Sequence, residues 1–439
     1  MRLPTQGTPP SQLLSRMSEL RAGDARWRDG RTWSLVYYAG EEIYDLIKQA
    51  YTMFMSENGL NLGAFPSLRK FESEVVAMTA SMLGGDEEVA GSMTSCGTES
   101  ILMAVKAYRD RARAERPEVR APELLMPETA HPAFQKAAHY FDLTPVRVPV
   151  KSDFRADVEA MRAAVNDNTI LIVGSAPSYP QGVIDPIAEL AALALEKGVG
   201  CHVDSCLGGF LLPFIRKLGH PVPDFDFRVP GVTSISADVH KYGFAAKGAS
   251  TVLYRDKNLR RYQHFVYTEW SGGIYLSPTM TGTRPGGAIA AAWAIMSHLG
   301  EEGYLRLAGT IMSTAKRLIE GVNSIPGLHV LGSPDMSVFA FAPAELNAYS
   351  LGDAMEARGW HLDRQMKPAC LHLMVTPAHE KVVETFLADL RDSVKAVEAS
   401  KSSPPEGTAA MYGMMGSIPD QGLIKNFVLD FMDDLMKVK

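Results

Sequence analysis

The chain has 439 residues, of which 46% are hydrophobic and 21% are charged, and its formal net charge is −6. This length predicts two or three domains around a large core, and the mild acidity gives no reason to expect a nucleic-acid partner. No signal-peptide core and no run of about 18 uncharged apolar residues occur, so we expect a cytoplasmic protein without a transmembrane anchor.

The first 60 residues are expected to form an N-terminal segment made of an arm and a helix. Residues 1–30 are polar with early prolines, which indicates a mobile or partner-clasping arm. Apolar residues recur at helical spacing from Glu41 to Met55 and again from Pro66 to Leu83. The stretch 58–63 breaks this pattern, so the second helix is placed in the next domain.

Residues 61–300 are expected to form the large domain. Between residues 123 and 254, apolar strand-like runs alternate with helical patterns. This alternation predicts an α/β domain with a mostly parallel sheet, whose ligands gather at the carboxyl ends of its strands. The apolar runs are 124–126, 145–150, 169–174, 200–203, 232–235 and 250–254.

Small and hydroxyl residues follow the run 90–94, at the start of a long helical pattern. The stretch 95–100 reads Ser-Cys-Gly-Thr-Glu-Ser. Free backbone N–H groups, the helix dipole and side-chain donors make such a helix start an anion site. A plain helix N-cap is the other interpretation of Ser or Thr at this place. The stretch alone leaves both interpretations open.

Two residues at strand ends have the chemistry of a pyridoxal 5'-phosphate (PLP) site. Lys241 follows the apolar run 232–235, and Asp204 follows the run 200–203. A PLP enzyme needs a lysine to bind the cofactor aldehyde and a carboxylate to hold the pyridine nitrogen protonated. Most lysines are solvated surface charges, so Lys241 alone is weak evidence. The pair, on neighbouring predicted strands, predicts PLP as the cofactor.

Residues 301–439 are expected to form a smaller α+β domain. A long helical pattern at 286–323, punctuated by Gly300 and Gly303, leads into it. Short strands are predicted at 328–331, 337–342 and 370–375, and helices at 350–358 and 378–397. Residues 401–407 have the composition of a linker, and 422–437 read as an amphipathic helix. The four cysteines form no CxxC pair or zinc spacing, which favours free thiols and no metal site.

Several longer stretches, in order along the chain, carry a family resemblance. They include TSCGTES (94–100), AHPAFQKAAHYFDL (130–143), HVDSCLGGF (202–210), SADVHKYG (236–243) and GGIYLSPTMTGTRPGG (272–287). From about residue 38 onward, the chain resembles the sphingosine-1-phosphate lyases, a branch of the group II PLP-dependent decarboxylase-like enzymes. The resemblance implies a type I PLP-dependent transferase fold and a homodimer with both active sites at its interface.

The resemblance also implies roles for individual residues near the cofactor. Lys241 matches the lysine that forms a Schiff base with PLP, and Asp204 matches the partner of the pyridine nitrogen. His131 matches a histidine stacked on the cofactor ring. Tyr275 and Tyr412 match tyrosines near the active site, although a tyrosine is more often a packing residue.

Further matches concern the cofactor phosphate and the dimer. Gly97 and Thr98, together with His240, match contacts to the phosphate of PLP. With this match, the anion-site interpretation of the helix start outweighs the simple cap. Thr283 matches a serine that, in the family, one subunit contributes to the active site of the other. Threonine retains the hydroxyl group of that serine.

A second set of matches concerns the phosphate of the substrate itself. Lys247 matches a lysine of that pocket, and Tyr38 matches its tyrosine, with Tyr37 as the alternative one residue away. Asn61 stands where the family has a histidine. An amide adds no positive charge, and a charge-assisted hydrogen bond is roughly twice as strong as a neutral one. The pocket is therefore expected to be weaker, or tuned to a different head group.

The activity implied by the resemblance is a retro-aldol cleavage. Its substrate is a phosphorylated long-chain 2-amino-3-hydroxy compound such as sphingosine-1-phosphate, and its products are a fatty aldehyde and phosphoethanolamine. Lys241, a tyrosine and a phosphate oxygen are alternatives for the base that removes the hydroxyl proton.

Two other functions stay open. One is an amino-acid decarboxylase on the same scaffold, which needs a cation such as Arg284 for the substrate carboxylate. The other is a catalytically silent PLP-fold protein that acts as a binding partner or scaffold. The joint presence of Lys241, Asp204 and His131 argues against the silent protein.

Overall fold

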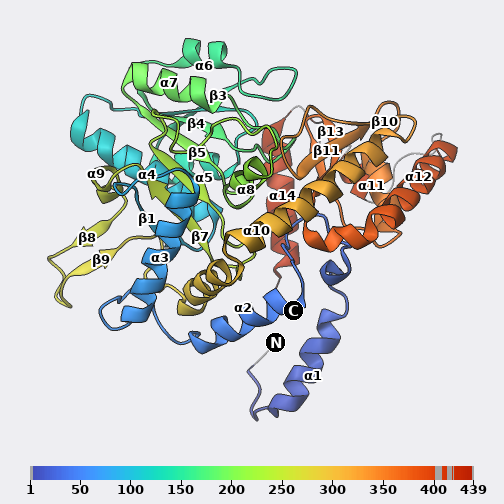
Figure 1. Cartoon of the computed structure of the whole chain (residues 1–439), viewed down its shortest axis with the longest axis horizontal. Helices are drawn as coiled ribbons and strands as arrows, with labels where there is room; N and C mark the ends of the chain where they lie inside the picture. The colour runs from blue at the N-terminus through green and yellow to red at the C-terminus, as the bar shows by residue number, and fades with distance from the viewer. Residues whose placement is uncertain (1–2, 401–407, 413–417, 419, 438–439) are drawn as a thin grey trace.

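The computed structural model of the chain describes residues 3–400, 408–412, 418 and 420–437. A large domain surrounds a seven-stranded sheet, and a smaller domain surrounds a four-stranded sheet (Figure 1). The linker expected at 401–407 lies outside the described residues. None of the helices in the described ranges has the length and apolar character needed to cross a bilayer.

The large sheet has the strand order β1-β7-β6-β5-β4-β2-β3. Its strands are β1 (Ala90–Thr94), β2 (Glu123–Pro127), β3 (Thr144–Val148), β4 (Thr169–Ser175), β5 (Gly200–Asp204), β6 (Ser234–Ala237) and β7 (Ser250–Tyr254). The pairs from β3 through β6 are parallel, whereas β7 pairs antiparallel with both β6 and β1. The prediction of a mostly parallel sheet is therefore confirmed.

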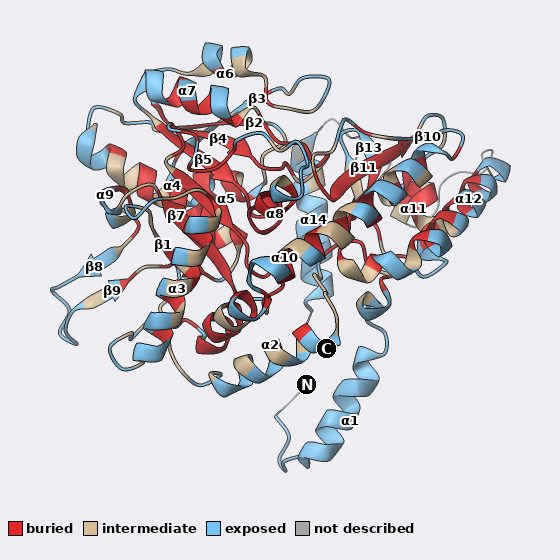
Figure 2. Cartoon of the chain, viewed as in Figure 1, coloured by how far each residue is buried: buried red, intermediate tan, exposed pale blue. Residues whose placement is uncertain are grey.

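Helices cover both faces of this sheet. Successive side chains of a strand point to opposite faces, so Leu125 of β2 packs in one layer while Leu124 and Met126 pack in the other. On one side lie α4 (Gly97–Glu115) and α5 (Ala133–Phe141). On the other lie α3 (Pro66–Met82), α7 (Ile187–Lys197) and α8 (Leu212–Lys217). Figure 2 shows the resulting buried core along the strands.

The long helix α10 (Gly286–Asn323) joins the two domains. At Gly300 its backbone leaves the helical conformation, with φ 52° and ψ −170°. The small sheet beyond it has the order β10-β11-β13-β12, and all of its pairs are antiparallel. Its elements are β10 (Leu328–Val330), β11 (Val338–Pro343), α11 (Ala348–Glu356), β12 (Asp363–Met366), β13 (Ala369–Met374), η3 (Pro377–Val382) and α12 (Val383–Ala399).

The N-terminal segment packs onto the small domain. After η1 (Trp27–Asp29), the backbone N–H of Trp33 donates to His361 O over 3.1 Å, and that of Met374 donates to Trp33 O over 2.8 Å. The Trp33 ring is fully buried and stacks on His379 with 4.1 Å between ring centroids. The chain then enters α2 (Glu41–Met53). This path carries residues 34–37 to the boundary between the two domains.

Several elements were not predicted from the sequence, among them the strand β12, a helix near the N-terminus and a hairpin. The arm contains a helix, α1 (Pro10–Arg21), which buries none of its residues (Figure 2). A hairpin of β8 (Phe265–Tyr267) and β9 (Tyr275–Ser277) projects from the large domain (Figure 1). The remaining elements are α6 (Val158–Ala164), η2 (Gly208–Phe210), α9 (Lys257–Arg261) and α14 (Gln421–Leu435).

Candidate active site

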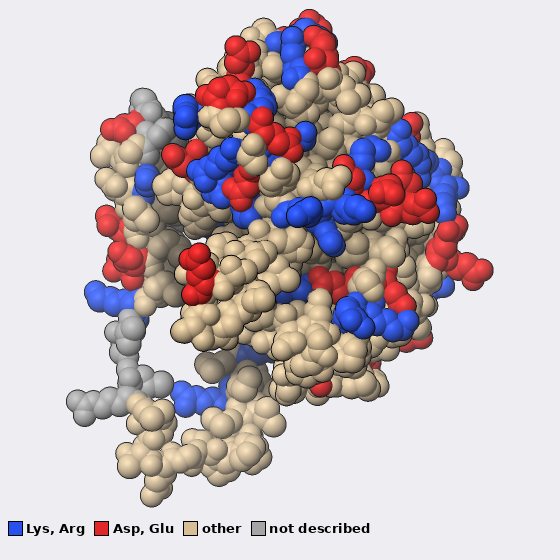
Figure 3. Space-filling view, turned by 90° about the vertical axis from the view of Figure 1, so that its left-hand side faces the viewer, with Lys and Arg blue, Asp and Glu red and all other residues tan. Residues whose placement is uncertain are grey.

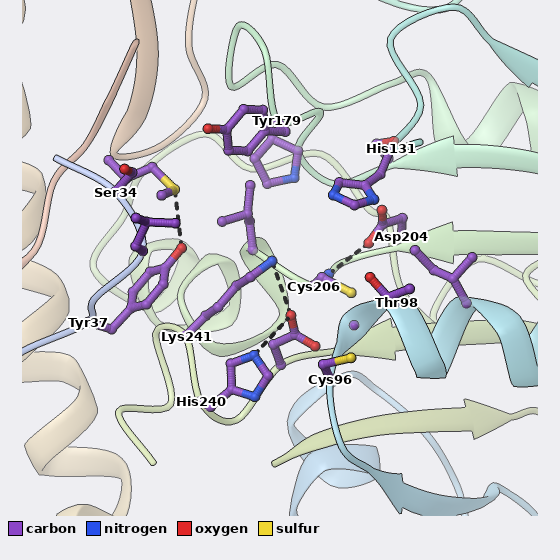
Figure 4. A pocket seen from close by; sticks show the side chains of 18 of the residues that line it. Ser34, Tyr37, Cys96, Thr98, His131, Tyr179, Asp204, Cys206, His240 and Lys241 are labelled. Atoms are coloured by element: carbon purple, nitrogen blue, oxygen red, sulfur yellow. Dashed lines mark hydrogen bonds and ion pairs between the residues drawn. The ribbon is translucent and has the colours of Figure 1, made fainter. Parts of the chain in front are cut away.

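A cavity of about 310 Å³ lies at the carboxyl ends of the parallel strands. The large domain supplies most of its wall, the N-terminal segment contributes Ser34 and Tyr37, and the small domain contributes Asp363 and Met374. Figure 4 shows side chains from these separate segments converging on one space. The sequence-predicted residues in the wall are Gly97, Thr98, His131, Asp204, His240, Lys241 and Lys247.

Lys241 lies just beyond β6, and its ammonium is paired with a carboxylate. Its Nζ is 3.1 Å from Oδ2 of Asp238, a residue to which the sequence assigned no role. Burial opposes the charge of Lys241, but Asp238, Cys206 and Asp204 together raise its pKa above the usual value. Burial also lowers the pKa of the adjacent His240 to about 4, so this imidazole is neutral. Lys241 becomes a nucleophile only after its Nζ gives up a proton.

Asp204 ends β5 and is anchored from two sides. Its Oδ1 accepts a hydrogen bond from the backbone N–H of Cys206 over 3.1 Å and from the hydroxyl of Ser236 over 3.3 Å. His131, which follows β2, lies beside it in Figure 4. Nδ1 of His131 accepts from the N–H of Ala133 at 3.1 Å, and burial lowers the pKa of the ring against the pull of Asp204. A neutral, flat ring therefore lies next to a buried carboxylate.

The start of α4 has the form of a phosphate cradle. Cys96 takes the N-cap position but makes no side-chain capping bond, so it leaves the first backbone N–H groups of α4 uncapped. Cys96, Gly97 and Thr98 line the cavity at this point. A Cβ on Gly97 would lie 2.7 Å from both Asp238 Oδ2 and Cys206 Sγ, so no side chain fits there. This tight approach, with Lys241 and Asp204 in the same cavity wall, fits PLP bound through its phosphate, aldehyde and ring nitrogen.

Lys247 and Tyr37 face each other on the opposite wall. Lys247 as a whole residue is exposed, but its charged end is enclosed by the cavity wall, where Nζ lies over the ring of Tyr37, 5.2 Å from the centroid. Burial and repulsion from Lys241 lower the pKa of Lys247 to about 8. The hydroxyl of Tyr37 donates to Met374 Sδ over 3.2 Å, whereas Tyr38 points away and donates to Glu41 Oε1 over 2.6 Å. Of the tyrosine pair, Tyr37 is the one that lines the cavity.

Among the cavity residues that sequence reasoning missed, three share hydrogen bonds. The carboxylate of Asp363 accepts from Ser34 Oγ over 2.8 Å and from Tyr179 OH over 2.6 Å. These residues come from the small domain, the N-terminal segment and the loop after β4. No local motif connects them, because they meet only when the two domains are assembled. Asp238, by contrast, belongs to the SADVHKYG stretch and was open to detection there.

Besides Tyr38, four predicted site residues lie outside this cavity within the single chain. Asn61 and Tyr275 line a second cavity of about 820 Å³, and Thr283 lies beside it, with its hydroxyl 3.4 Å from Asn58 Nδ2. Tyr412 packs against Tyr349, with 5.3 Å between ring centroids.

Arg284, the predicted candidate for a carboxylate-binding cation, is already paired. Its buried guanidinium holds both oxygens of Glu72 and also donates to the carbonyls of Met93 and Gly59. Among the described residues, no arginine lines the cavity that contains Lys241.

Comparisons with known proteins agree with this geometry. Residues 17–342 match the model of the pyridoxal-dependent decarboxylase conserved domain. The sphingosine-1-phosphate lyase of Arabidopsis thaliana is 49% identical, and the match covers 96% of this chain and 79% of the relative. The sphingosine-1-phosphate lyase 1 of Rattus norvegicus is 43% identical, with 99% of this chain and 76% of the relative covered.

Solved structures give the same result. The sphingosine-1-phosphate lyase of Burkholderia pseudomallei superposes with a TM-score of 0.92 at 39% identity, covering 100% of this chain and 98% of that one. The glutamate decarboxylase of Lactobacillus brevis, with a TM-score of 0.80 at 21% identity over 91% of this chain and 95% of that one, shares the fold. The type I PLP fold expected from the sequence is thereby confirmed, and the chain belongs to the sphingosine-1-phosphate lyase family.

Proposed function

We propose that this chain cleaves sphingosine-1-phosphate, or a related phosphorylated long-chain base, to a fatty aldehyde and phosphoethanolamine. The observation that carries the proposal is the cationic pocket of Lys247 and Tyr37 in the same cavity as Lys241 and Asp204. A cation beside an aromatic hydroxyl suits a phosphate head group. Membership of the lyase family supports the same substrate class.

Each residue of the cofactor wall has a distinct task in this proposal. Lys241 binds the cofactor aldehyde, Asp204 keeps the ring nitrogen protonated, and His131 packs on the ring. Gly97, Thr98 and His240 hold the cofactor phosphate. When bound, PLP supplies an electron sink for the carbon–carbon bond that breaks.

The pKa shifts of the wall residues bear on which group accepts the proton of the substrate hydroxyl in this proposal. Burial raises the pKa of Tyr37 and of Tyr179, and Asp363 adds to the effect on Tyr179. Both phenols therefore stay protonated and serve as hydrogen-bond donors. Among the described residues in the wall, the neutral rings of His131 and His240, and the amine of Lys241 once it has given up a proton, are left as nitrogen bases.

An amino-acid decarboxylase is the rival function. It needs a cation for the substrate carboxylate, and Arg284 is occupied by Glu72. The test compares aldehyde release from sphingosine-1-phosphate with carbon dioxide release from common amino acids, using Lys241→Ala as the inactive control. Carbon dioxide release without aldehyde release would reverse the assignment. Absence of a visible absorbance band with added PLP would instead indicate the silent protein.

We further propose a homodimer in which each chain completes the active site of its partner. Asn61, Tyr275 and Thr283 gather at the second cavity, away from Lys241. The adjacent hairpin exposes the apolar residues Phe265, Val266, Trp270, Ile274 and Leu276. Figure 3 looks onto this side of the molecule and shows a broad area without charged side chains. Such a patch marks an interaction surface.

A mixing experiment tests the shared site. Lys241→Ala and Tyr275→Ala chains are each expected to be inactive as homodimers. In a mixed dimer, one of the two sites receives both native residues, so activity should return on mixing. Sedimentation of the wild type checks the dimer itself. A dimer whose mixed form stays inactive would contradict the sharing of sites.

Two further proposals concern organisation and location. We place the domain boundary at Gly300, where α10 is interrupted, with residues 1–60 as a segment that bridges both domains. We also propose a cytoplasmic location, because the four cysteines are free thiols and three of them are buried.

A further inference from the structure

A row of hydrogen bonds leads from Asp204 into the core along β5 and β6. The hydroxyl of Ser236 donates to Asp204 Oδ1. The imidazole of His202 lies between two serines, with Nε2 3.2 Å from Ser236 Oγ and Nδ1 2.7 Å from Ser234 Oγ. The hydroxyl of Tyr108, on α4, lies 2.8 Å from Ser234 Oγ and continues the row. The mechanism proposed above uses Asp204 alone.

The register of the two strands explains why these side chains meet. His202 is paired with Ser234, and Asp204 with Ser236. Residues two apart in a strand share a face, so all four side chains lie on the same face of the sheet. All four are buried, and the ring of Phe134 packs edge-on against His202 at 5.8 Å. Side chains in such a dry environment keep their partners, because an unpaired buried polar group is costly.

The protonation state of His202 determines which group donates and which accepts in each hydrogen bond of the row. Burial lowers the pKa of His202 to about 4, against the pull of Asp204, so the ring is neutral with one donor and one acceptor nitrogen. The hydroxyl of Tyr108, which also lies 2.7 Å from Thr233 Oγ1, donates to Ser234. This leaves the Ser234 hydroxyl to donate to Nδ1. Nε2–H of His202 then donates to Ser236. The Ser236 hydrogen is thereby directed at the carboxylate of Asp204.

We propose that His202 is a positioning residue that acts through Ser236 to hold the carboxylate of Asp204 turned toward the ring nitrogen of the cofactor. A hydrogen bond donated to a carboxylate stabilises its charged form, and a charged Asp204 stabilises a protonated ring. Cys206 Sγ donates to the oxygen of Ser236 over 3.3 Å, and Nε2–H of His202 donates to the same oxygen. With two donors on its oxygen, the hydroxyl of Ser236 keeps its own hydrogen for Asp204. The inference rests on the proposed assignment of Asp204 to the ring nitrogen.

Two pairs of variants separate positioning from simple packing. His202→Gln keeps an amide donor near the position of Nε2, whereas the shorter His202→Asn reaches only the position of Nδ1. Ser236→Ala removes the hydroxyl that contacts Asp204. Its matched control is Ser205→Ala, because Ser205 is equally buried and adjacent to Asp204 but donates to the carbonyl of Ala176 over 2.9 Å.

The measurement is a pH titration of the ¹⁵N resonance of PLP labelled at its ring nitrogen and bound to each variant, with thermal unfolding of the cofactor-free proteins as a check on folding. A hydrogen bond to a charged group changes an equilibrium by about tenfold or more. We expect Ser236→Ala and His202→Asn to lower the protonation constant of the ring nitrogen by about tenfold. His202→Gln and Ser205→Ala should stay within about threefold of the wild type, by the same reasoning.

The outcomes are distinguishable. If Asp204→Asn leaves the ring nitrogen as protonated as in the wild type, the assignment of Asp204 fails, and this inference fails with it. If Asp204→Asn alone changes the titration, the role of His202 and Ser236 is overturned while the proposed function stands. Equal effects of Ser205→Ala and Ser236→Ala would likewise overturn it, because they would show a general response to lost packing.

Discussion

The low pKa of Lys247 predicts a pH dependence that a surface lysine would not show. Burial, then repulsion from Lys241, lower this pKa to about 8, and Asp238 only partly opposes them. The ammonium is therefore present below pH 8 and is lost as the pH rises above it. We expect kcat/KM for sphingosine-1-phosphate to fall between pH 8 and pH 10.

The size of this fall follows from the interaction that is lost. A hydrogen bond to a charged group contributes about 1.5–3 kcal/mol, or roughly ten- to a hundredfold at about 1.4 kcal/mol per decade. At pH 10, two units above the pKa, only about 1% of Lys247 keeps its proton. Because kcat/KM reports the ionisation of the free enzyme, the fall should appear there, while kcat changes less.

The assay measures aldehyde release between pH 7 and pH 10 for the wild type and for Lys247→Arg. A guanidinium keeps its charge over this range, so the variant should show a flat profile above pH 8. Unphosphorylated sphingosine is the matched substrate control, since it has no phosphate to lose. An equal fall for the variant, or for sphingosine, would refute the assignment of Lys247 to the substrate phosphate.

Three further predictions concern other parts of the two cavities. Tyr37→Phe should lower kcat/KM by about tenfold, because one hydrogen bond to a charged group is lost. Tyr38→Phe should leave kcat/KM unchanged. Steady-state kinetics on both variants shows which tyrosine contacts the substrate phosphate. Gly97→Ala should weaken PLP binding by at least about tenfold, because the added Cβ would lie 2.7 Å from two neighbouring atoms. Absorbance titration with PLP measures the affinity of the variant. An affinity equal to that of the wild type would remove Gly97 from the phosphate cradle. Asn61→His should partly lower the Michaelis constant for the phosphorylated lipid at pH 6, where the imidazole is charged, and a constant equal to that of the wild type would remove residue 61 from the phosphate pocket.

Regular packing explains why so much of the large domain could be predicted from the sequence. Every strand of the sheet except the edge strand β3 is buried on both faces, so its apolar run is visible without knowledge of its neighbours. The predicted strand 200–203 and the observed β5 (Gly200–Asp204) differ by one residue. Because parallel strands end at one edge, Asp204 and Lys241 could be placed together from their positions after such runs.

The other half of the site could not be predicted, because it depends on contacts between distant segments. Ser34, Tyr179 and Asp363 share hydrogen bonds although they belong to three separate parts of the chain. The choice between Tyr37 and Tyr38 has the same cause. Two adjacent tyrosines are equivalent in sequence, and only the path of the backbone past β13 shows which one enters the cavity. Periodicity carries no information on that path.

The charges in the cavity indicate that a single chain provides an incomplete phosphate site. The charged residues in its wall are Asp204, Asp238 and Asp363 against Lys241 and Lys247, because His131 and His240 are neutral. A wall with three carboxylates and two ammonium groups has no excess positive charge for two phosphates, those of cofactor and substrate. The N–H groups at the start of α4 can offset only one of them.

The second cavity has an excess of positive charge in its wall. Arg69 and Arg260 line it, and neither has a carboxylate within 4.0 Å among the described residues, whereas its Arg284 and Glu72 neutralise each other. In the proposed dimer, this cavity of one chain would face the Lys241 cavity of the other. The two guanidinium groups would then supply the charge that Asn61, in place of a histidine, does not. On this reasoning, the loss of that histidine costs least where the partner subunit brings arginines.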